Sequence, residues 1–375
     1  MSGRSWRIGR LFGINIFIDS SWLLIFLLIT WTLAAGYFPQ AYPRWPLSQY
    51  WIVAAITSVL FFASVLFHEL SHSVVAQAQG ESIDRITLFL FGGAAQMTDE
   101  PKTAGTEFLM AIAGPLASLV LAGLYGALWY VLRGSTQALS AMFYYLGIIN
   151  VGLAVFNLVP GFPLDGGRVL RSIVWGITGD LRRATRIASW AGQTVAFLIS
   201  MVGVLSILSG NFLNGLWLVF IGWFLRNAAL SSYRQVIVRD IMKDVLASQL
   251  MRRDFMPIHP EMTLQELVDE YFIRRSEHAY PVMENNQLAG IICLHDVRNR
   301  PRTEWATTLV RQAMTPRPEL QVVGPEDDGT TILARMAAKD VHQVPVVTDS
   351  QVVGMITRND VVRFLQWQTE LGMQA

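Results

Sequence analysis

The residues most capable of chemistry stand close together in the stretch Phe67-His68-Glu69-Leu70-Ser71-His72. Histidines four positions apart lie on one face of a helix, so His68 and His72 can bind one zinc ion. Glu69 is then placed to take a proton from an attacking water molecule. A plainer interpretation is a helix with two packed histidines and an exposed glutamate. Because histidine and glutamate are costly inside a hydrocarbon layer, and the surrounding segment is apolar, we favour the metal site.

A third ligand must come from elsewhere, since a catalytic zinc usually keeps three protein ligands and one open position. The best candidate is Asp165, the first charged residue after the window 134–164. It lies in Asn157-Leu-Val-Pro-Gly-Phe-Pro-Leu-Asp165-Gly-Gly-Arg168, where prolines and glycines break regular helix. Irregular backbone at membrane depth is tolerated only where it is buried in protein or lines a wet cavity. The alternative is an interfacial turn with a solvated aspartate.

These residues belong to a half of the chain that is suited to a membrane. Of 375 residues, 52% are hydrophobic and 15% charged, and only 22 of the 57 charged residues precede residue 231. Long windows without Asp, Glu, Lys or Arg can each cross a bilayer as a helix. Residues 1–230 are therefore predicted to form a mainly α-helical polytopic membrane domain. Its six transmembrane helices are expected at about 16–36, 50–77, 105–132, 141–159, 188–208 and 212–230.

Arginine placement predicts the orientation, because positively charged loops stay on the cytoplasmic side. Arginines gather before the first helix, after the fourth and after the sixth, whereas the opposite loops offer little more than Arg44 and Arg133. We expect a multi-pass protein of the cell (inner) membrane whose amino end and residues after 231 face the cytoplasm. A net charge of +1 gives no reason to expect a nucleic-acid partner. Cys293 is the single cysteine, which excludes an internal disulfide.

Residues 231–375 contain an internal repeat with a shift of 64 positions. His278-Ala-Tyr-Pro-Val-Met matches His342-Gln-Val-Pro-Val-Val, and Gly290-Ile-Ile-Cys-Leu-His-Asp296 matches Gly354-Met-Ile-Thr-Arg-Asn-Asp360. The lead-ins Val238-Arg-Asp-Ile-Met242 and Val310-Arg-Gln-Ala-Met314 are also similar. Short β-prone runs between amphipathic helices predict two copies of a small soluble α/β unit. The repeats, at about 238–300 and 310–370, resemble a tandem pair of cystathionine-β-synthase-type (CBS) domains, with strands expected at 279–283, 288–293, 344–348 and 352–357.

The membrane half resembles the site-2 protease family of intramembrane zinc metalloproteases. The resemblance is carried, in the family's order, by His68-Glu69-x-x-His72, Gly114-Pro115-x-x-Ser118 and Asn157-x-x-Pro160-x-x-x-Leu164-Asp165-Gly166. It implies one Zn²⁺ per chain, held by His68, His72 and Asp165, with Glu69 as general base. Asn157 matches a family residue thought to help hold substrate or the developing oxyanion. Ser118 stands where many relatives carry Asn; alternatively, Gly114 and Ser118 simply allow close helix packing.

The CBS resemblance implies an adenine nucleotide ligand (ATP, ADP or AMP) contacted by Thr357 and Asp360. A helix capping box explains Thr357-x-x-Asp360 equally well without a ligand. The first copy carries Cys293 in place of the hydroxyl, which argues against a second nucleotide site. Because CBS pairs commonly associate, a homodimer through this pair is expected.

Together these features predict an intramembrane zinc endopeptidase. It would hydrolyse a peptide bond in or near the transmembrane segment of a membrane-protein substrate, as in regulated intramembrane proteolysis, under control of the nucleotide or of dimerisation. Residues 86–97 are predicted to form a hairpin whose open edge pairs with the unwound substrate; the alternative is a packed hairpin without substrate contact. Rival functions are a CBS-gated membrane transporter or channel and an inactive protease-like scaffold.

Overall fold

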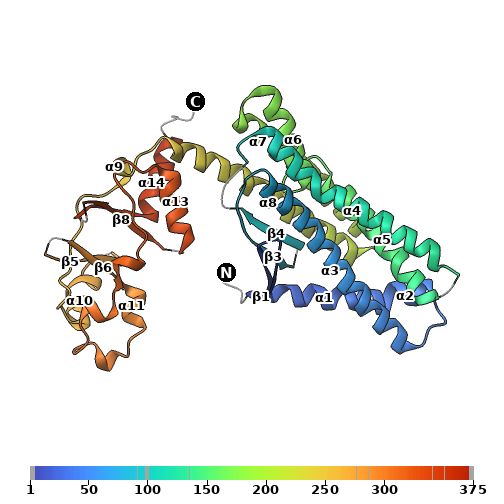
Figure 1. Cartoon of the computed structure of the whole chain (residues 1–375), viewed down its shortest axis with the longest axis horizontal. Coiled ribbons are helices and arrows are strands. Elements are labelled where there is room, and N and C mark those ends of the chain that lie inside the picture. The colour runs from blue at the N-terminus through green and yellow to red at the C-terminus, as the bar shows by residue number, and fades with distance from the viewer. Residues whose placement is uncertain are drawn as a thin grey trace. The chain divides into compact units, whose positions relative to one another are not determined.

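The computed structural model describes residues 5–90, 92–97, 101–134, 136–275, 277–285, 287–339, 341–349 and 351–370. The chain divides into two compact units, Met1–Arg234 and Gln235–Ala375 (Figure 1). The division falls within one helix, α8 (Phe212–Lys243).

The first unit is built from long apolar helices. Among the described residues, six helical segments are long and apolar enough to cross a membrane, as predicted. The first, Ser20–Ala41, comprises α1 (Ser20–Thr32), a π-helical turn (Leu33–Tyr37) and α2 (Phe38–Ala41). The others are α3 (Leu47–Ala78), α4 (Ala104–Leu132), α5 (Gln137–Asn157), α7 (Leu181–Leu208) and α8.

Several bounds in this unit differ from the prediction: α7 begins at Leu181 and not at 188, and α8 continues to Lys243 and not to 230. The predicted helix 16–36 begins too early, because Ile14–Asp19 forms a strand, β2. The Asp19 carboxylate accepts a hydrogen bond from the Ser21 N–H at 2.9 Å and so fixes the start of α1. The short amphipathic helix α6 (Asp165–Thr178) was not among the predicted elements, and Gly179, at φ 70°, ends it.

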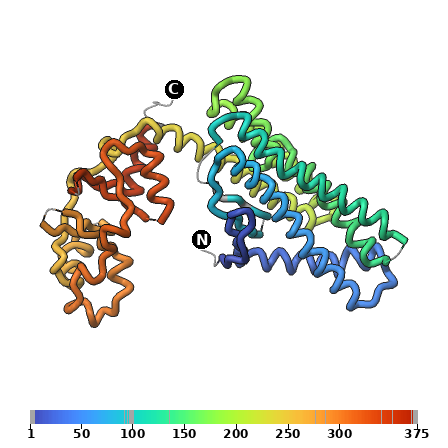
Figure 2. Tube along the Cα trace, viewed as in Figure 1, coloured from blue at the N-terminus to red at the C-terminus, as the bar shows by residue number. Residues whose placement is uncertain are grey.

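A four-stranded sheet lies at one end of the helices. Its order is β1 (Ser5–Leu11), β2, β3 (Ile83–Phe89) and β4 (Gly92–Met97). Strands β2 and β3 pair in parallel, and the other neighbours are antiparallel. Figure 2 shows the dark-blue amino-terminal strands beside the teal strands that follow α3. The start of α1 and the end of α3 therefore share one end of the unit. The hairpin expected at 86–97 is present, apart from residue 91, which lies outside the described residues.

Helices α7 and α8 cross at unusually short range, because glycines face each other. A Cβ atom built on Gly203 would lie 2.7 Å from the Gly215 carbonyl oxygen and 2.8 Å from the Val219 nitrogen. Small residues at such crossings let helix backbones approach closely in a membrane.

The second unit holds two β-hairpins that repeat the same register. In one, β5 (Ala279–Glu284) pairs with β6 (Gln287–Cys293); in the other, β8 (Gln343–Thr348) pairs with β9 (Gln351–Thr357). A small core joins the two repeats through Leu288, Ile291, Val352 and Met355. The predicted α/β tandem is confirmed. The remaining α-helices and strand of this unit are α9 (Ala247–Leu250), α10 (Leu264–Leu267), α11 (Leu294–Arg298), α12 (Val310–Ala313), β7 (Thr315–Pro316), α13 (Gly329–Ala338) and α14 (Arg358–Glu370).

The sequence comparison matched the lead-in 238–242 with 310–314, but these two segments have different structures. Residues 238–242 continue α8, whereas 310–313 form the separate turn α12. The structural counterpart of Leu309 is Leu246. The backbone N–H of each donates to a glutamine side chain three residues on, at 3.1 Å in both repeats.

Candidate metal centre

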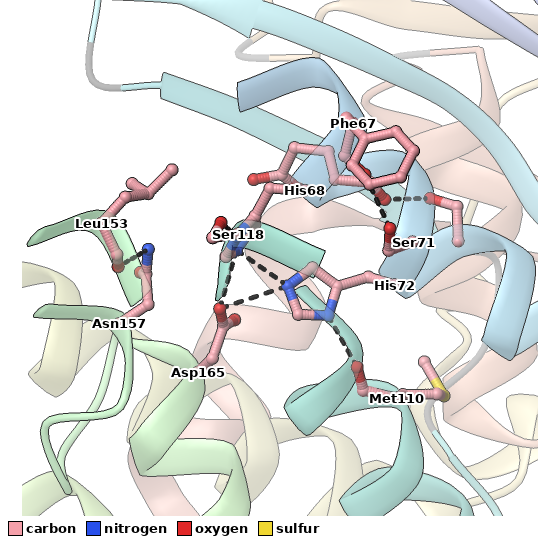
Figure 3. Close-up of polar contacts among 11 residues, drawn as sticks. Phe67, His68, Ser71, His72, Met110, Ser118, Leu153, Asn157 and Asp165 are labelled. Carbon is pink, nitrogen blue, oxygen red and sulfur yellow. Dashed lines mark hydrogen bonds and ion pairs between the residues drawn. The ribbon is translucent and has the colours of Figure 1, made fainter. Parts of the chain in front are cut away.

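Three predicted ligands converge inside the first unit. His68 and His72 lie on one face of α3 and are only 3% and 8% exposed. Asp165 is the first residue of α6, and its Oδ2 lies 3.0 Å from His68 Nε2 and 3.2 Å from His72 Nε2. The two Nε2 atoms are 3.2 Å apart, so the donors form a near-equilateral triangle (Figure 3).

Helix α4 orients both imidazoles through contacts to their Nδ1 atoms. His72 Nδ1 lies 2.6 Å from the Met110 carbonyl oxygen, which can only accept a hydrogen bond, so Nδ1 carries the proton. The Nε2 lone pair of the neutral ring then points at the triangle. His68 Nδ1 lies 2.8 Å from Ser118 Oγ, and with Nδ1 as donor His68 has the same tautomer. Ser118 is fully buried.

The two imidazoles fit only because α4 presents a glycine to them. A Cβ atom on Gly114 would stand 2.6 Å from His68 Nε2 and would also overlap His72 Nε2. Gly114 therefore allows close approach, as one of the two interpretations held. Ser118 does more than pack, because its hydroxyl contacts an imidazole.

The donor set fits a zinc ion. Two imidazole nitrogens and a carboxylate oxygen form a usual catalytic zinc set that leaves a fourth position open. Tetrahedral ligands at ~2.0–2.1 Å from the metal are about 3.3 Å from one another, close to the spacing of these three atoms. In the described part of the chain, this is the one group of three or more His, Cys, Asp or Glu residues that could hold a metal.

Asp165 reaches the centre because the first turn of α6 packs directly against the backbone of the preceding segment. Cβ atoms on Gly166 and Gly167 would overlap the Leu158 carbonyl group and the Gly161 backbone, respectively. The two glycines thus let α6 start within the irregular segment 158–164. The Asp165 side chain is 17% exposed and contacts both imidazoles, so it is not the solvated turn residue of the alternative interpretation.

Comparison with known proteins gives the family. The model of peptidase family M50 matches residues 56–138 and 132–202, and the CBS domain model matches 238–302 and 310–366. A Synechocystis protein named zinc metalloprotease sll0528 is 35% identical over 96% of this chain and 95% of its own length. The chain belongs to peptidase family M50. It is an integral membrane zinc metalloprotease of the site-2 protease type with CBS domains.

Two further similarities accompany that match. The protein named zinc metalloprotease Rip3 of Mycobacterium tuberculosis is 33% identical over 96% of this chain and 92% of its own length. The solved structure of a site-2 protease from Methanocaldococcus jannaschii shares 28% identity and covers 62% of this chain and 96% of its own, with a TM-score of 0.43.

The two other residues predicted to take part in catalysis in this M50 protein, the general base Glu69 and the substrate or oxyanion residue Asn157, have different surroundings. Glu69 is half-buried on α3, and β4 passes beside it: a Cβ atom on Gly93 would lie 3.0 Å from Glu69 Cδ. Asn157 ends α5, and its Nδ2 donates to the carbonyl oxygen of Leu153 at 3.0 Å (Figure 3). Its amide thus bonds its own helix.

In the CBS unit, Thr357 and Asp360 form the capping box of α14. Asp360 Oδ2 accepts from the Thr357 N–H at 2.9 Å and from its hydroxyl at 2.6 Å. Arg252 Nε also donates to Asp360, at 3.2 Å. In the first repeat, Asp296 caps the Cys293 N–H in the same way at 2.9 Å. Thr357 and Asp360 thus form the capping box. A nucleotide bound here would contact a hydroxyl and a carboxylate that are already hydrogen-bonded to each other.

Sequence reasoning missed two features of the helices around the centre. The Met110 carbonyl belongs to the backbone, so no residue type signals its role. Glu107 and Arg171, a buried ion pair between α4 and α6, carried a usable signal: a glutamate beside an uncharged window is costly in a membrane.

Proposed function

We propose that this M50 metalloprotease cleaves a peptide bond in or near the transmembrane segment of a membrane-protein substrate. The observation that carries the proposal is the convergence of His68, His72 and Asp165 beside Glu69, within a unit of long apolar helices. A zinc ion bound there supplies Lewis acidity toward a carbonyl oxygen and toward water. Glu69 accepts the proton of the attacking water and returns it to the leaving amine.

Asn157 has a secondary role in this proposal. Its Nδ2 donor is held by a carbonyl of its own helix, a bond that a substrate oxygen can replace. Once turned toward the centre, the amide would donate to the developing oxyanion.

The function is tested by cleavage and metal content together. The full chain is reconstituted with a panel of tagged single-span membrane proteins, with and without a chelator. Wild type should cut at least one substrate and hold one zinc per chain. Glu69→Gln should keep zinc but lose cleavage, whereas Asp165→Ala should lose both. Ser71→Ala removes a partly exposed hydroxyl that donates to the Phe67 carbonyl of its own helix; as the matched control it should keep both zinc and cleavage.

The same experiment separates the rival functions. A transporter or channel gated by its CBS pair would keep its activity after zinc removal and cut nothing. An inactive scaffold would hold zinc without cutting any member of the panel.

We further propose that the substrate adds as a strand to β4. Among the described residues, β4 pairs only with β3, and it passes beside Glu69. Main-chain hydrogen bonds to an edge strand would hold an unwound segment with little demand on its sequence.

Prolines at two adjacent positions test this idea. Consecutive N–H groups of a strand point to opposite sides. Of Ala94→Pro and Ala95→Pro, one therefore removes a donor that faces β3 (the inward variant), and the other removes a donor that faces the open edge (the outward variant). The outward variant should keep its melting temperature and lose kcat/KM by about 10-fold, the cost of a hydrogen bond of ~1 kcal/mol or slightly more. Equal cleavage by that variant and wild type would exclude strand addition.

For localisation, we propose the cell membrane, with the amino end and the CBS unit in the cytoplasm. The arginine distribution supports it, and the β2–β3 pairing supports a common side for the amino end and the residues after α3. In a Cys293→Ser background, Gln351→Cys should resist an impermeant maleimide in intact cells, and Asn211→Cys between α7 and α8 should react. The reverse pattern would invert the topology.

For regulation, we propose that Thr357 and Asp360 contact an adenine nucleotide and that the CBS pair forms a homodimer. The family match supports both. Titration with ATP, ADP and AMP should show binding that Thr357→Ala weakens and Cys293→Ala leaves unchanged. Light scattering of the detergent-solubilised chain should give twice the chain mass. If no nucleotide binds, the capping box remains the role of Thr357 and Asp360.

A further inference from the structure

A buried ion pair joins α6, which supplies Asp165 to the metal centre, to α4, which contacts both imidazoles. Glu107 of α4 is fully buried, and Arg171 of α6 is 6% exposed. Arg171 Nε donates to Glu107 Oε1 at 2.7 Å, and its Nη2 contacts the same oxygen. Arg168 Nε lies 3.8 Å from that oxygen. Burying charges costs much free energy, so such a pair is poor evidence of stabilisation and calls for another role.

The pair stands where it can control the geometry of the centre. Glu107 lies one helical turn before Met110, whose carbonyl holds His72. Arg171 lies six residues after Asp165, or about 9 Å along α6. One partner therefore belongs to the helix that orients the imidazoles, and the other to the helix that supplies the carboxylate.

Arg171 also touches the irregular segment that leads into α6. Its guanidinium lies 5.2 Å from the centre of the Phe162 ring, within cation–π range. A planar guanidinium with fixed donor directions sets orientation more strictly than apolar contact does. Arg171 thus fixes α6 against both α4 and the segment that precedes Asp165.

We propose that Glu107 and Arg171 are positioning residues that set the register of α6 on α4 and so hold Asp165 at bonding distance from the two imidazoles. The inference rests on the metal centre of the proposed function. It assigns the pair a role in metal affinity, distinct from a role in the stability of the fold.

The test replaces the pair by apolar residues and measures zinc affinity on the full chain in detergent. Apolar replacement of a buried ion pair often preserves or raises stability. Glu107→Leu/Arg171→Met should therefore melt at or above the wild-type temperature without metal. Its zinc affinity should nevertheless fall by about 10- to 100-fold, as when residues supporting metal ligands are removed. The absorption of bound Co²⁺ should also change, because the carboxylate leaves the ligand set.

Two further variants complete the design. Arg171→Lys keeps the charge but loses the two-pronged contact, and should fall between wild type and the double variant. Arg186→Gln removes an arginine of α7 that donates to Tyr233 of α8 at 3.1 Å, and as the matched control it should bind zinc like wild type.

The outcomes separate this inference from the proposed function. A double variant that binds zinc within about twofold of wild type, while Asp165→Ala loses it, overturns the positioning role alone. If Asp165→Ala and His68→Ala also bind zinc like wild type, the metal centre itself is wrong.

Discussion

At the scale of single residues, the centre depends on one absent side chain. A methyl group on Gly114 would overlap both metal-facing nitrogens. Gly114→Ala should therefore weaken zinc binding by at least about 10-fold and abolish cleavage. Gly123→Ala, in the same helix with nothing within 4 Å of its Cβ position, should bind zinc normally. Metal analysis of the two purified proteins decides the matter, and equal zinc contents would contradict the prediction.

Ser118 supports one imidazole by a single hydrogen bond. Ser118→Ala removes the partner of His68 Nδ1 and leaves that N–H buried without an acceptor. We expect zinc to bind about 10- to 100-fold more weakly, and Ser118→Asn to restore much of the loss. Competition with a zinc-chelating dye measures both. An unchanged affinity in Ser118→Ala would mean that the serine only packs.

The Cys293 thiol is expected to react slowly with alkylating reagents. Burial, followed by the neighbouring Asp296 carboxylate, raises the pKa of its thiol to about 11. Only the thiolate reacts, so a rise of two pKa units above 9 leaves about 100-fold less of it at pH 7.5. Alkylation by iodoacetamide should be slower than that of a free thiol by about this factor and should accelerate as the pH rises to 10. A fast reaction at pH 7.5 would refute this prediction.

Part of the metal centre can be predicted from the sequence. The spacing of His68 and His72 predicts their shared helix face, and the isolated charge of Asp165 marks it as the third donor. Contacts such as Met110 to His72 could not be predicted, because they depend on which turn of α4 faces α3.

At the scale of elements, the crossing of α7 and α8 has no room for a side chain. Gly203→Val would press on the Gly215 carbonyl and should lower the free energy of unfolding by about 1–3 kcal/mol. Gly126→Val, with nothing within 4 Å of its Cβ position, is the control and should change stability far less. Thermal unfolding in one detergent compares the two. Equal losses would mean that the crossing is not tight in solution.

The predictability of an element follows its physical signal. Uncharged windows predict the six long helices, because crossing a hydrocarbon layer imposes both length and composition. Strand β2 and helix α6 escape prediction because their boundaries depend on local contacts: the Asp19 cap in one case and the glycines against segment 158–164 in the other.

At the scale of the whole molecule, the unit Gln235–Ala375 has apolar cores of its own. One contains Met242, Ile332 and Ile356, and another contains Leu264, Tyr280 and Ile292. Expressed alone, residues 235–375 should fold and unfold in one cooperative transition by circular dichroism. A Val346→Ala substitution in the first core should cost about 1–3 kcal/mol, and exposed Val362→Ala within about 0.5 kcal/mol. A featureless melt would show that the cores need the rest of the chain.

The length of α3 has a consequence for the lipid around it. Thirty-two residues span about 48 Å, whereas the hydrocarbon of a bilayer is about 30 Å thick. The helix must lean or project, and each choice changes how deep the His68 turn sits below the headgroups. The length of the lipid acyl chains should therefore control how much water reaches the His68 turn. The turnover rate, measured in liposomes whose bilayers differ in thickness, should pass through an optimum, so the bilayer itself would regulate the enzyme.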